Sequence, residues 1–243
     1  MEAVLYICHG SRVKQAQEQA VSFIQSCMEE INAPIQEYCF LELATPSIET
    51  AFRKCINRGA TKIIAVPVLL LTAGHAKEDI PSELSRINSI FPTITVEYSQ
   101  PIGVHPDIIE ILIERIKETK HELTAEESMI LLVGRGSGDP QVKVDLSRIA
   151  EMLSERSGTK KVDVCFLAAS NPSFEEGFEK AKESGFKQVF IIPYLLFTGI
   201  LMRKIEKMIQ TEPKLDQEMI LCSYLGYHPL LKKILKDRVK EHI

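Results

Sequence analysis

The chain repeats itself at a constant offset of 126 residues, and this duplication limits its possible folds more than any other feature. Residues 40–54 return as residues 166–180, and Gly10 returns as Gly136. The positions that are kept are those expected in turns, helix starts and buried cores. The repeat therefore predicts two copies of one structural unit, each about half of the chain.

The two copies differ at three positions where chemistry is expected. The second copy has arginine, alanine and leucine in the places of His9, Glu42 and His75. Imidazole and carboxylate groups bind metal ions and transfer protons, whereas alanine and leucine do neither. We therefore expect the first copy to carry the reactive groups and the second copy to form the opposite wall of the site.

The composition argues against several classes of protein. Lys and Arg number 29 against 33 Asp and Glu, and no basic run occurs, which argues against a nucleic-acid partner. No apolar stretch reaches the roughly 18 residues of a membrane span, and the first residues lack a basic segment and a cleavage site, so we expect neither a membrane span nor a signal peptide. The six cysteines are scattered without a Cys-x-x-Cys pair, so we expect reduced, buried thiols and a cytoplasmic protein.

Two common nucleotide-binding motifs do not occur in the sequence. No G-x-x-x-x-G-K-[ST] phosphate-binding loop is present, so nucleotide hydrolysis has no evident site. The glycine-rich residues 134–138 run into Asp139 and Pro140 and lack the last glycine of the dinucleotide-binding fingerprint. The sequence therefore favours a chemistry that uses neither ATP nor a dinucleotide.

Short apolar segments alternate with helical patterns along both halves of the chain. We expect strands at residues 4–8, 35–41, 63–71 and 93–98, and again at 129–133, 162–167, 188–196 and 219–224. Pro46 and Pro81 are expected in the first turns of helices, where proline is favoured. Nearly continuous apolar strands are typical of parallel sheets, so the alternation predicts an α/β fold.

The way in which these eight strand–helix units assemble stays open at this point. The polar connection at residues 121–127 suggests one lobe of residues 1–121 and another of residues 122–243. Two open four-stranded sheets would satisfy this division. A closed (β/α)₈ barrel would also satisfy it, because a duplicated half-barrel shows the same repeat.

Three candidate metal ligands follow the carboxyl ends of predicted strands, which is where α/β sheets bind ligands. His9 comes directly after the first strand, Glu42 ends the second, and His75 lies four residues beyond the third. In a flavodoxin-like strand order 2-1-3-4, the first and third strands are neighbours at the switch point. His9 and His75 should then face each other, with Glu42 beside His9. Two imidazoles and a carboxylate suit iron, cobalt, nickel or zinc and leave positions open for exchange.

Each of the three residues also has a simpler interpretation. His9 could bond a turn carbonyl, His75 could begin a helix without a further role, and Glu42 could be a solvated residue at a strand end. Their joint replacement in the second copy favours the metal site over these interpretations.

Four further polar residues lie near the same strand ends. Arg12 and Arg135 follow strands closely and could bind substrate carboxylates in bidentate geometry. Ser11 and Ser137, each preceded by glycine, could add backbone N–H donors at helix starts. We expect all four residues to contact an anionic substrate.

These segments together resemble those of the sirohydrochlorin chelatases, the ATP-independent class II chelatases of siroheme and cobalamin synthesis. The first matching stretch is residues 9–12, and the second is residues 40–43 together with 46–48. The third runs from residue 66 to residue 81 and matches at residues 66–70, 74–75 and 79–81. The resemblance covers essentially the whole chain in its long, fused form and is nearest to the iron-inserting members of siroheme synthesis. It implies two flavodoxin-like lobes, each a four-stranded parallel sheet with helices on both faces, rather than a barrel.

The resemblance also implies an activity and a site. Such enzymes insert a divalent metal into sirohydrochlorin without ATP, and His9, His75 and Glu42 match their metal-handling residues. Fe²⁺ is the expected metal substrate and Co²⁺ the alternative, because the C-terminal region has neither a histidine-rich segment nor cluster-binding cysteines. No permanently bound cofactor, nucleic acid or membrane is expected. One chain that supplies both lobes implies a monomer.

Metal insertion fits these residues on chemical grounds, because neutral imidazole can bind an ion or accept a proton near pH 7. Arg12 and Arg135 on opposing lobes could clamp the carboxylates of the macrocycle, and Leu43 and Leu201 could help to form apolar walls. Two rival functions remain. A histidine phosphatase would normally have arginine where Cys8 precedes the histidine, and a non-catalytic metal or tetrapyrrole carrier would use the same site.

Overall fold

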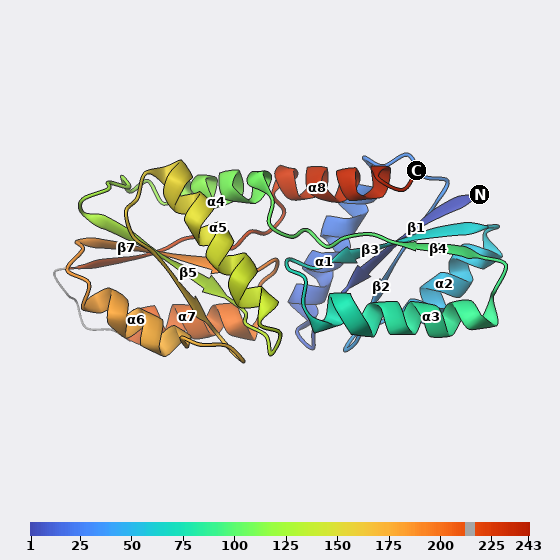
Figure 1. Ribbon diagram of the computed structural model, residues 1–243, viewed down its shortest axis with the longest axis horizontal. Coiled ribbons are helices and arrows are strands. Elements are labelled where there is room, and N and C mark those ends of the chain that lie inside the picture. The colour runs from blue at the N-terminus through green and yellow to red at the C-terminus, as the bar shows by residue number, and fades with distance from the viewer. Residues whose placement is uncertain (212–216) are drawn as a thin grey trace. The chain divides into compact units, whose positions relative to one another are not determined.

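The protein consists of two α/β units that share one architecture. This computed structural model describes residues 1–211 and 217–243 (Figure 1). The first sheet has the parallel strand order β2-β1-β3-β4, with bounds β1 Glu2–Cys8, β2 Ile35–Phe40, β3 Lys62–Val68 and β4 Thr95–Tyr98. The second sheet has the matching order β6-β5-β7-β8, with bounds β5 Ser128–Gly134, β6 Val162–Phe166, β7 Gln188–Tyr194 and β8 Glu218–Leu221.

Helices follow the strands in regular alternation along the chain. The helices of the first copy are α1 Lys14–Met28, α2 Ile48–Asn57, the π-helical turn η1 His75–Asp79, α3 Ile80–Ile90 and α4 Pro106–Glu118. Those of the second copy are α5 Gln141–Ser157, α6 Phe174–Lys182, α7 Ile200–Thr211 and α8 Pro229–Lys240. Among the described residues, no helix is both long and apolar enough to cross a lipid bilayer.

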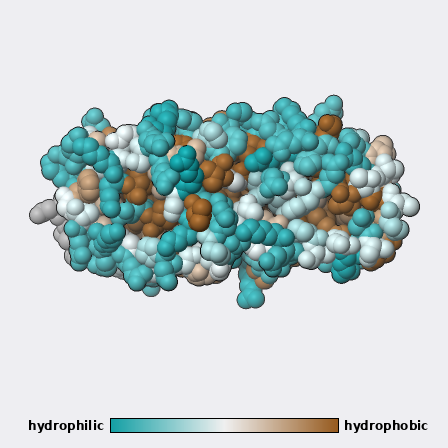
Figure 2. Space-filling view, in the orientation of Figure 1, coloured by the Kyte–Doolittle hydropathy of each residue, from teal (hydrophilic) through white to brown (hydrophobic). Residues whose placement is uncertain are grey.

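Each sheet is buried on both faces, which explains the nearly continuous apolar strands. In the first unit, Leu5 and Ile7 of β1 join a core cluster with α2 and α3 on one face. Val4 and Tyr6 alternate with them and are also fully buried, on the face that α1 and α8 cover. Polar residues cover most of the face visible in Figure 2, with apolar residues in smaller patches between them.

The sequence-based predictions of the strands and of their order are confirmed, with two local corrections. Two separate four-stranded sheets exclude the closed barrel. Strand β3 ends at Val68 rather than at residue 71, so a longer loop leads to His75. Pro46 does not lie in the first turn of a helix, because α2 begins at Ile48 and Ser47 caps it by accepting a hydrogen bond from Thr50 N–H.

The two compact units do not coincide with the two sequence copies. One unit comprises Met1–Gly103 together with Pro229–Ile243, and the other comprises Val104–His228. Helix α4, from the first copy, packs against α5 and β7, whereas α8, from the second copy, packs against α1 and β3. The folded units thus divide the chain differently from the boundary predicted between residues 121 and 122. Each copy lends its last helix to the other unit.

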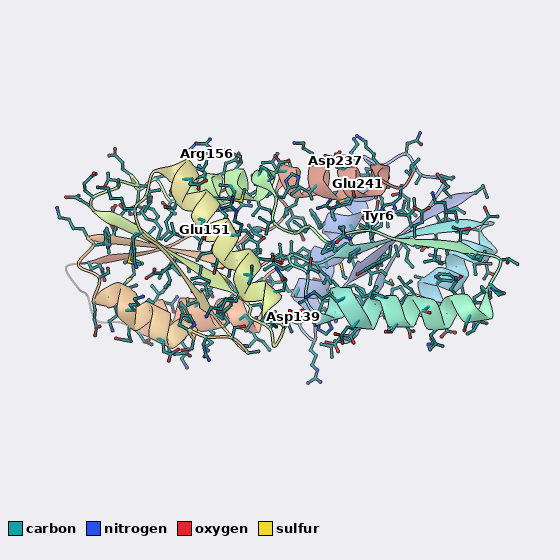
Figure 3. All side chains as sticks on the ribbon, viewed as in Figure 1. Tyr6, Asp139, Glu151, Arg156, Asp237 and Glu241 are labelled. Carbon is teal, nitrogen blue, oxygen red and sulfur yellow. The ribbon has the colours of Figure 1, made fainter. Side chains whose placement is uncertain are left out.

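Matching arginines fasten the two exchanged helices. Arg115 of α4 donates to the carbonyl oxygen of Leu225 at 2.6 Å, and Arg238 of α8 donates to that of Ile102 at 3.3 Å. Arg156 of α5, labelled in Figure 3, adds an ion pair of 2.6 Å to Glu110 of α4. The same kind of contact therefore holds each helix against the unit that receives it.

A histidine beyond each exchanged helix makes a second matching contact. His121 pairs with Glu218 of β8 at 3.0 Å, and His242 pairs with Glu97 of β4 at 2.8 Å. Hydrogen bonds from His242 and then from Lys62 lower the pKa of the Glu97 carboxyl below its usual value. The ends of both helices are thereby tied to the edge strand of the receiving sheet.

Removal of residues 229–243 should therefore unfold the unit that contains Met1–Gly103, although the removed residues belong to the second sequence copy. Helix α8 buries four large apolar side chains almost completely, namely Leu231, Ile234, Leu235 and Val239. Their burial contributes about 6 kcal/mol or more, which is comparable with the whole stability of a typical domain. Denaturant unfolding followed by circular dichroism should then show cooperative unfolding for Val104–His228 alone.

Deletion of residues 241–243 is the matched control, because it leaves α8 in place. This shorter truncation should keep both units folded, with a small loss from the missing His242 contact. Wild-type unfolding of the chain that ends at residue 228 would contradict the assignment of α8 to the first unit.

Candidate metal centre

His9 is held at the carboxyl end of β1 with one ring nitrogen already engaged. Its Nδ1 lies 3.0 Å from the carbonyl oxygen of Gly10. A carbonyl oxygen can only accept a hydrogen bond, so Nδ1 donates, and in the neutral ring Nε2 then keeps its lone pair. The turn-carbonyl contact that offered a simpler interpretation of His9 thus prepares the ring for binding a cation.

His75 begins the turn η1 beyond β3, and its ring is engaged in the same way. Its Nδ1 lies 2.7 Å from Oδ2 of Asp79. The carboxylate is an acceptor, so Nδ1 carries the hydrogen here as well, and in the neutral ring Nε2 keeps its lone pair. This contact was not predicted from the sequence, although the spacing of His75 and Asp79 by four residues on a helical segment is a visible signal.

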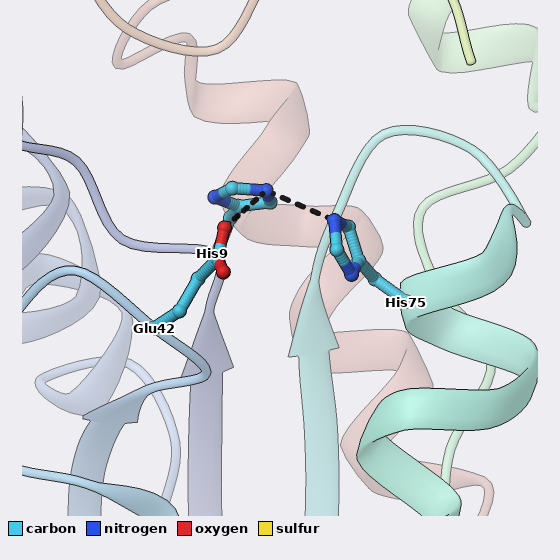
Figure 4. Close-up of side chains that lie close together, drawn as sticks. All are labelled: His9, Glu42 and His75. Carbon is cyan, nitrogen blue, oxygen red and sulfur yellow. Dashed lines mark hydrogen bonds and ion pairs between the residues drawn. The ribbon is translucent and has the colours of Figure 1, made fainter. Parts of the chain in front are cut away.

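The Nε2 atoms of His9 and His75 face each other beside the Glu42 carboxylate (Figure 4). Nε2 of His9 lies 3.1 Å from Nε2 of His75, and the ring planes are inclined by 80°. Oε1 of Glu42 lies 3.5 Å from Nε2 of His9. Two lone pairs and a carboxylate repel one another at these distances unless a proton or a metal cation lies between them.

The site therefore has the properties of an open metal centre. One ligand atom from each of His9, Glu42 and His75 lies within 4.8 Å of the others, and the described residues contain this single group of three. Their side chains are 22%, 47% and 34% exposed, so solvent reaches the site. Three protein ligands leave coordination positions for exchange, and two imidazoles with one carboxylate suit iron, cobalt, nickel or zinc.

A close contact between two loops brings His9 and Glu42 together. A β-carbon on Gly10 would stand 1.8 Å from the carbonyl oxygen of Glu42, and Gly10 has a φ of +100°. The N–H of Leu41 donates to the carbonyl of Cys8, and the N–H of Glu42 donates to that of His9. The loops after β1 and β2 therefore continue the pairing of their strands, which fixes the distance between the two side chains.

The second unit keeps this scaffold without its ligands. A β-carbon on Gly136 would stand 1.8 Å from the carbonyl oxygen of Ala168, and the N–H of Ala168 donates to the carbonyl of Arg135 at 2.9 Å. Arginine, alanine and leucine occupy the three ligand positions, the leucine being Leu201. The backbone geometry of the site is therefore a property of the fold that both copies share, whereas the three ligands occur in the first copy.

The four residues expected to bind substrate lie in the corresponding loops of the two units. Arg12 and Arg135 are exposed. The hydroxyl of Ser11 accepts a hydrogen bond from Val13 N–H, and that of Ser137 accepts one from Asp139 N–H. The serine hydroxyls thus stabilise the loops themselves, and α1 and α5 begin several residues later than a direct helix-start donor would require.

The cysteines take no part in the metal centre. All six are free and buried, as expected. Burial raises the pKa of the Cys8 thiol well above its usual range, so the residue beside His9 stays a neutral thiol and a poor ligand. Burial likewise raises the pKa to about 12 in four others, namely Cys27, Cys55, Cys165 and Cys222.

Comparison with known proteins assigns the family. The family model described as CbiX matches residues 3–119 and again residues 129–242, so the chain belongs to the CbiX family. The two matches follow the two sequence copies rather than the two folded units. A duplicated CbiX protein with one ligand-bearing copy is therefore the class that the fold and the site define.

Particular relatives are similar over nearly the full length. The chain is 52% identical to the sirohydrochlorin ferrochelatase of Priestia megaterium, over 99% of this chain and 90% of the relative. It is 36% identical to the sirohydrochlorin cobaltochelatase of the same organism, over 99% of this chain and 80% of the relative. The solved structure of SirB from Bacillus subtilis with Fe³⁺ matches with a TM-score of 0.88 at 42% identity, over 99% of this chain and 94% of that chain.

Substitution of Gly10 should damage the site through the backbone. In Gly10→Ala, the new β-carbon would overlap the Glu42 carbonyl and alanine would have to adopt a positive φ, so we expect a loss of about 1–3 kcal/mol or more in the free energy of unfolding. Binding of Co²⁺ should weaken as well, because His9 and Glu42 must separate. Denaturant unfolding and Co²⁺ titration measure the two effects.

Gly138→Ala is the matched control, since a β-carbon there meets nothing within 4 Å. We expect it to change neither quantity appreciably. Equal behaviour of the two variants would show that the contact between the loops does not position the ligands.

Proposed function

We propose that this protein is a sirohydrochlorin ferrochelatase, which inserts Fe²⁺ into sirohydrochlorin to give siroheme without ATP. The convergence of the Nε2 atoms of His9 and His75 beside the Glu42 carboxylate supports this function most directly. The similarity to a sirohydrochlorin ferrochelatase over 99% of the chain supplies the identity of the macrocycle.

The geometry of the three ligands matches what metal insertion demands. The incoming ion must exchange water for the pyrrole nitrogens, and two pyrrole protons must leave as the divalent charge enters the ring. In their neutral form, the imidazoles of His9 and His75 can hold the ion or accept a proton through Nε2, and the carboxylate of Glu42 can do the same. Their partial exposure lets the protons pass on to solvent and lets a new ion enter.

The choice of iron over cobalt rests on the degree of similarity. The chain shares 52% of its residues with the iron enzyme of Priestia megaterium and 36% with the cobalt enzyme of that organism. The ligand set itself suits both ions, because imidazole binds each of them well. We therefore assign Fe²⁺ as the metal substrate and retain Co²⁺ as an ion that the site also accepts.

The exposed arginines supply charge for the substrate. Sirohydrochlorin carries carboxylates around its rim, and a guanidinium binds a carboxylate through two parallel hydrogen bonds. We assign this role to Arg12 in the first unit and Arg135 in the second, with Ser11 and Ser137 shaping the loops that carry them.

The cysteines and the exchanged helices bear on the compartment and the oligomeric state of the protein. Six buried, unpaired cysteines fit a reducing compartment, so we place the enzyme in the cytoplasm. The exchange of α4 and α8 completes both units within one chain, which supports a monomer. No resident cofactor is needed, since the metal ion is a substrate.

His9→Ala and His75→Ala should each lower the rate of metal insertion by about 100-fold or more, because each removes a ligand or proton acceptor. An anaerobic absorbance assay of sirohydrochlorin with Fe²⁺ and no ATP measures this rate. His121→Ala, which removes a surface histidine paired with Glu218, is the matched control and should keep wild-type activity. Stoichiometric binding of the macrocycle without turnover by the wild type would instead identify a carrier.

Arg135→Ala should affect binding of the macrocycle more than the chemical step. Loss of a charged hydrogen bond costs roughly 1.5–3 kcal/mol, so KM for sirohydrochlorin should rise about tenfold or more while kcat changes little. Arg148→Ala removes an exposed arginine of α5 that pairs with Glu151 and should leave KM unchanged. Equal KM values for both variants would remove Arg135 from the substrate site.

A further inference from the structure

Asp79 contacts His75 on the side of the ring that faces away from the other ligands. Its Oδ2 lies 2.7 Å from Nδ1 of His75, whereas Nε2 of the same ring lies 3.1 Å from Nε2 of His9. A carboxylate accepts this hydrogen bond, so the contact keeps the ring hydrogen on Nδ1. It also limits rotation of the ring, which sets the direction of the Nε2 lone pair.

The backbone that carries the pair is a single π-helical turn. The N–H of Ile80 donates to the carbonyl of His75, five residues earlier. Pro81 has no N–H, and in an α-helix its ring would clash with the carbonyl group four residues before it. The wider π-helical turn relieves this clash. Ala76 and Ile80, four residues apart, both face the core, while His75 and Asp79 lie on the outer side of the turn.

The second copy lacks the histidine, the carboxylate and the proline together. At the offset of 126 residues, their places are taken by Leu201, Ile205 and Lys207. The corresponding helix, α7, is α-helical from Ile200 onward, and Ile205 is fully buried in the core. The π-turn and the carboxylate of Asp79 are therefore present in the copy that has the metal-site histidine and absent from the copy that lacks it. A surface ion pair without a role at the site would have no reason to follow the histidine in this way.

We propose that Asp79 is a positioning residue for metal insertion, which holds the imidazole of His75 so that an unprotonated Nε2 meets the incoming divalent ion. The two residues lie four positions apart in the turn η1, so their side chains share its outer face and meet there. This inference rests on the proposed function only in taking His9, Glu42 and His75 as the metal site. Hydrogen-bond partners of ligating histidines typically change metal affinity or activity by roughly 10–100-fold.

Titration of the whole protein with Co²⁺ alone, without a tetrapyrrole, tests the inference. We expect Asp79→Ala to weaken Co²⁺ binding by roughly 10–100-fold, as judged by the visible absorbance of the bound ion. Asp79→Glu should restore much of the affinity, because it returns a carboxylate. Glu78→Ala is the matched control, since Glu78 is an exposed carboxylate of the same turn, and it should bind Co²⁺ as the wild type does.

A second measurement reports the position of the ring hydrogen and does not depend on the metal. Imidazole ¹⁵N chemical shifts should place the hydrogen of His75 on Nδ1 in the wild type and in Glu78→Ala, and should show a mixture of tautomers in Asp79→Ala. A role limited to the stability of the turn would not change this signal.

The outcomes separate this inference from the proposed function. Unchanged Co²⁺ affinity and an unchanged tautomer in Asp79→Ala would overturn the role of Asp79, even if the wild type is an active chelatase. Loss of affinity with the altered tautomer would support that role, even if sirohydrochlorin is not turned over. A wild type that binds no Co²⁺ would overturn the inference, because the three residues would then not form a metal site.

Discussion

The site depends on the absence of a β-carbon at residue 10. The carbonyl oxygen of Glu42 occupies the space where that carbon would stand, so the loops after β1 and β2 can touch. This contact places His9 and Glu42 beside each other, and the neighbouring strand β3 leads to the turn that carries His75. Two of the three ligands thus depend on this backbone contact and on the hydrogen bonds beside it. The same contact recurs at Gly136, where no ligands remain.

The exchange of helices explains why a copy without ligands is still needed. The second copy supplies α8, whose apolar side chains cover one face of the sheet that presents His9. The first copy returns α4 to the other sheet in the same manner. Each unit is therefore incomplete without a helix from the other copy. The second copy keeps this structural role although it has no metal ligands.

The strand order and the meeting of His9, Glu42 and His75 could be predicted because parallel strands place their carboxyl ends at one edge. The exchange of α4 and α8 could not, since the two copies are similar enough for either helix to fit either sheet. The contact of Asp79 with His75 was not predicted, although a spacing of four residues on a helical segment is a signal for such a contact. The π-helical form of the turn left no such signal, because Ala76 and Ile80 share one face in a regular α-helix as well.

The exchange of helices determines the order in which the two units can fold while the chain is synthesised. The unit Val104–His228 is continuous in sequence, so it can fold as soon as its own residues have left the ribosome. The unit with the metal centre begins first but lacks α8 until Pro229–Ile243 emerges. Folding thus runs against the usual order, in which N-terminal domains fold first. A chain that is cut short would hold every metal ligand and still lack the helix that completes the ligand-bearing unit.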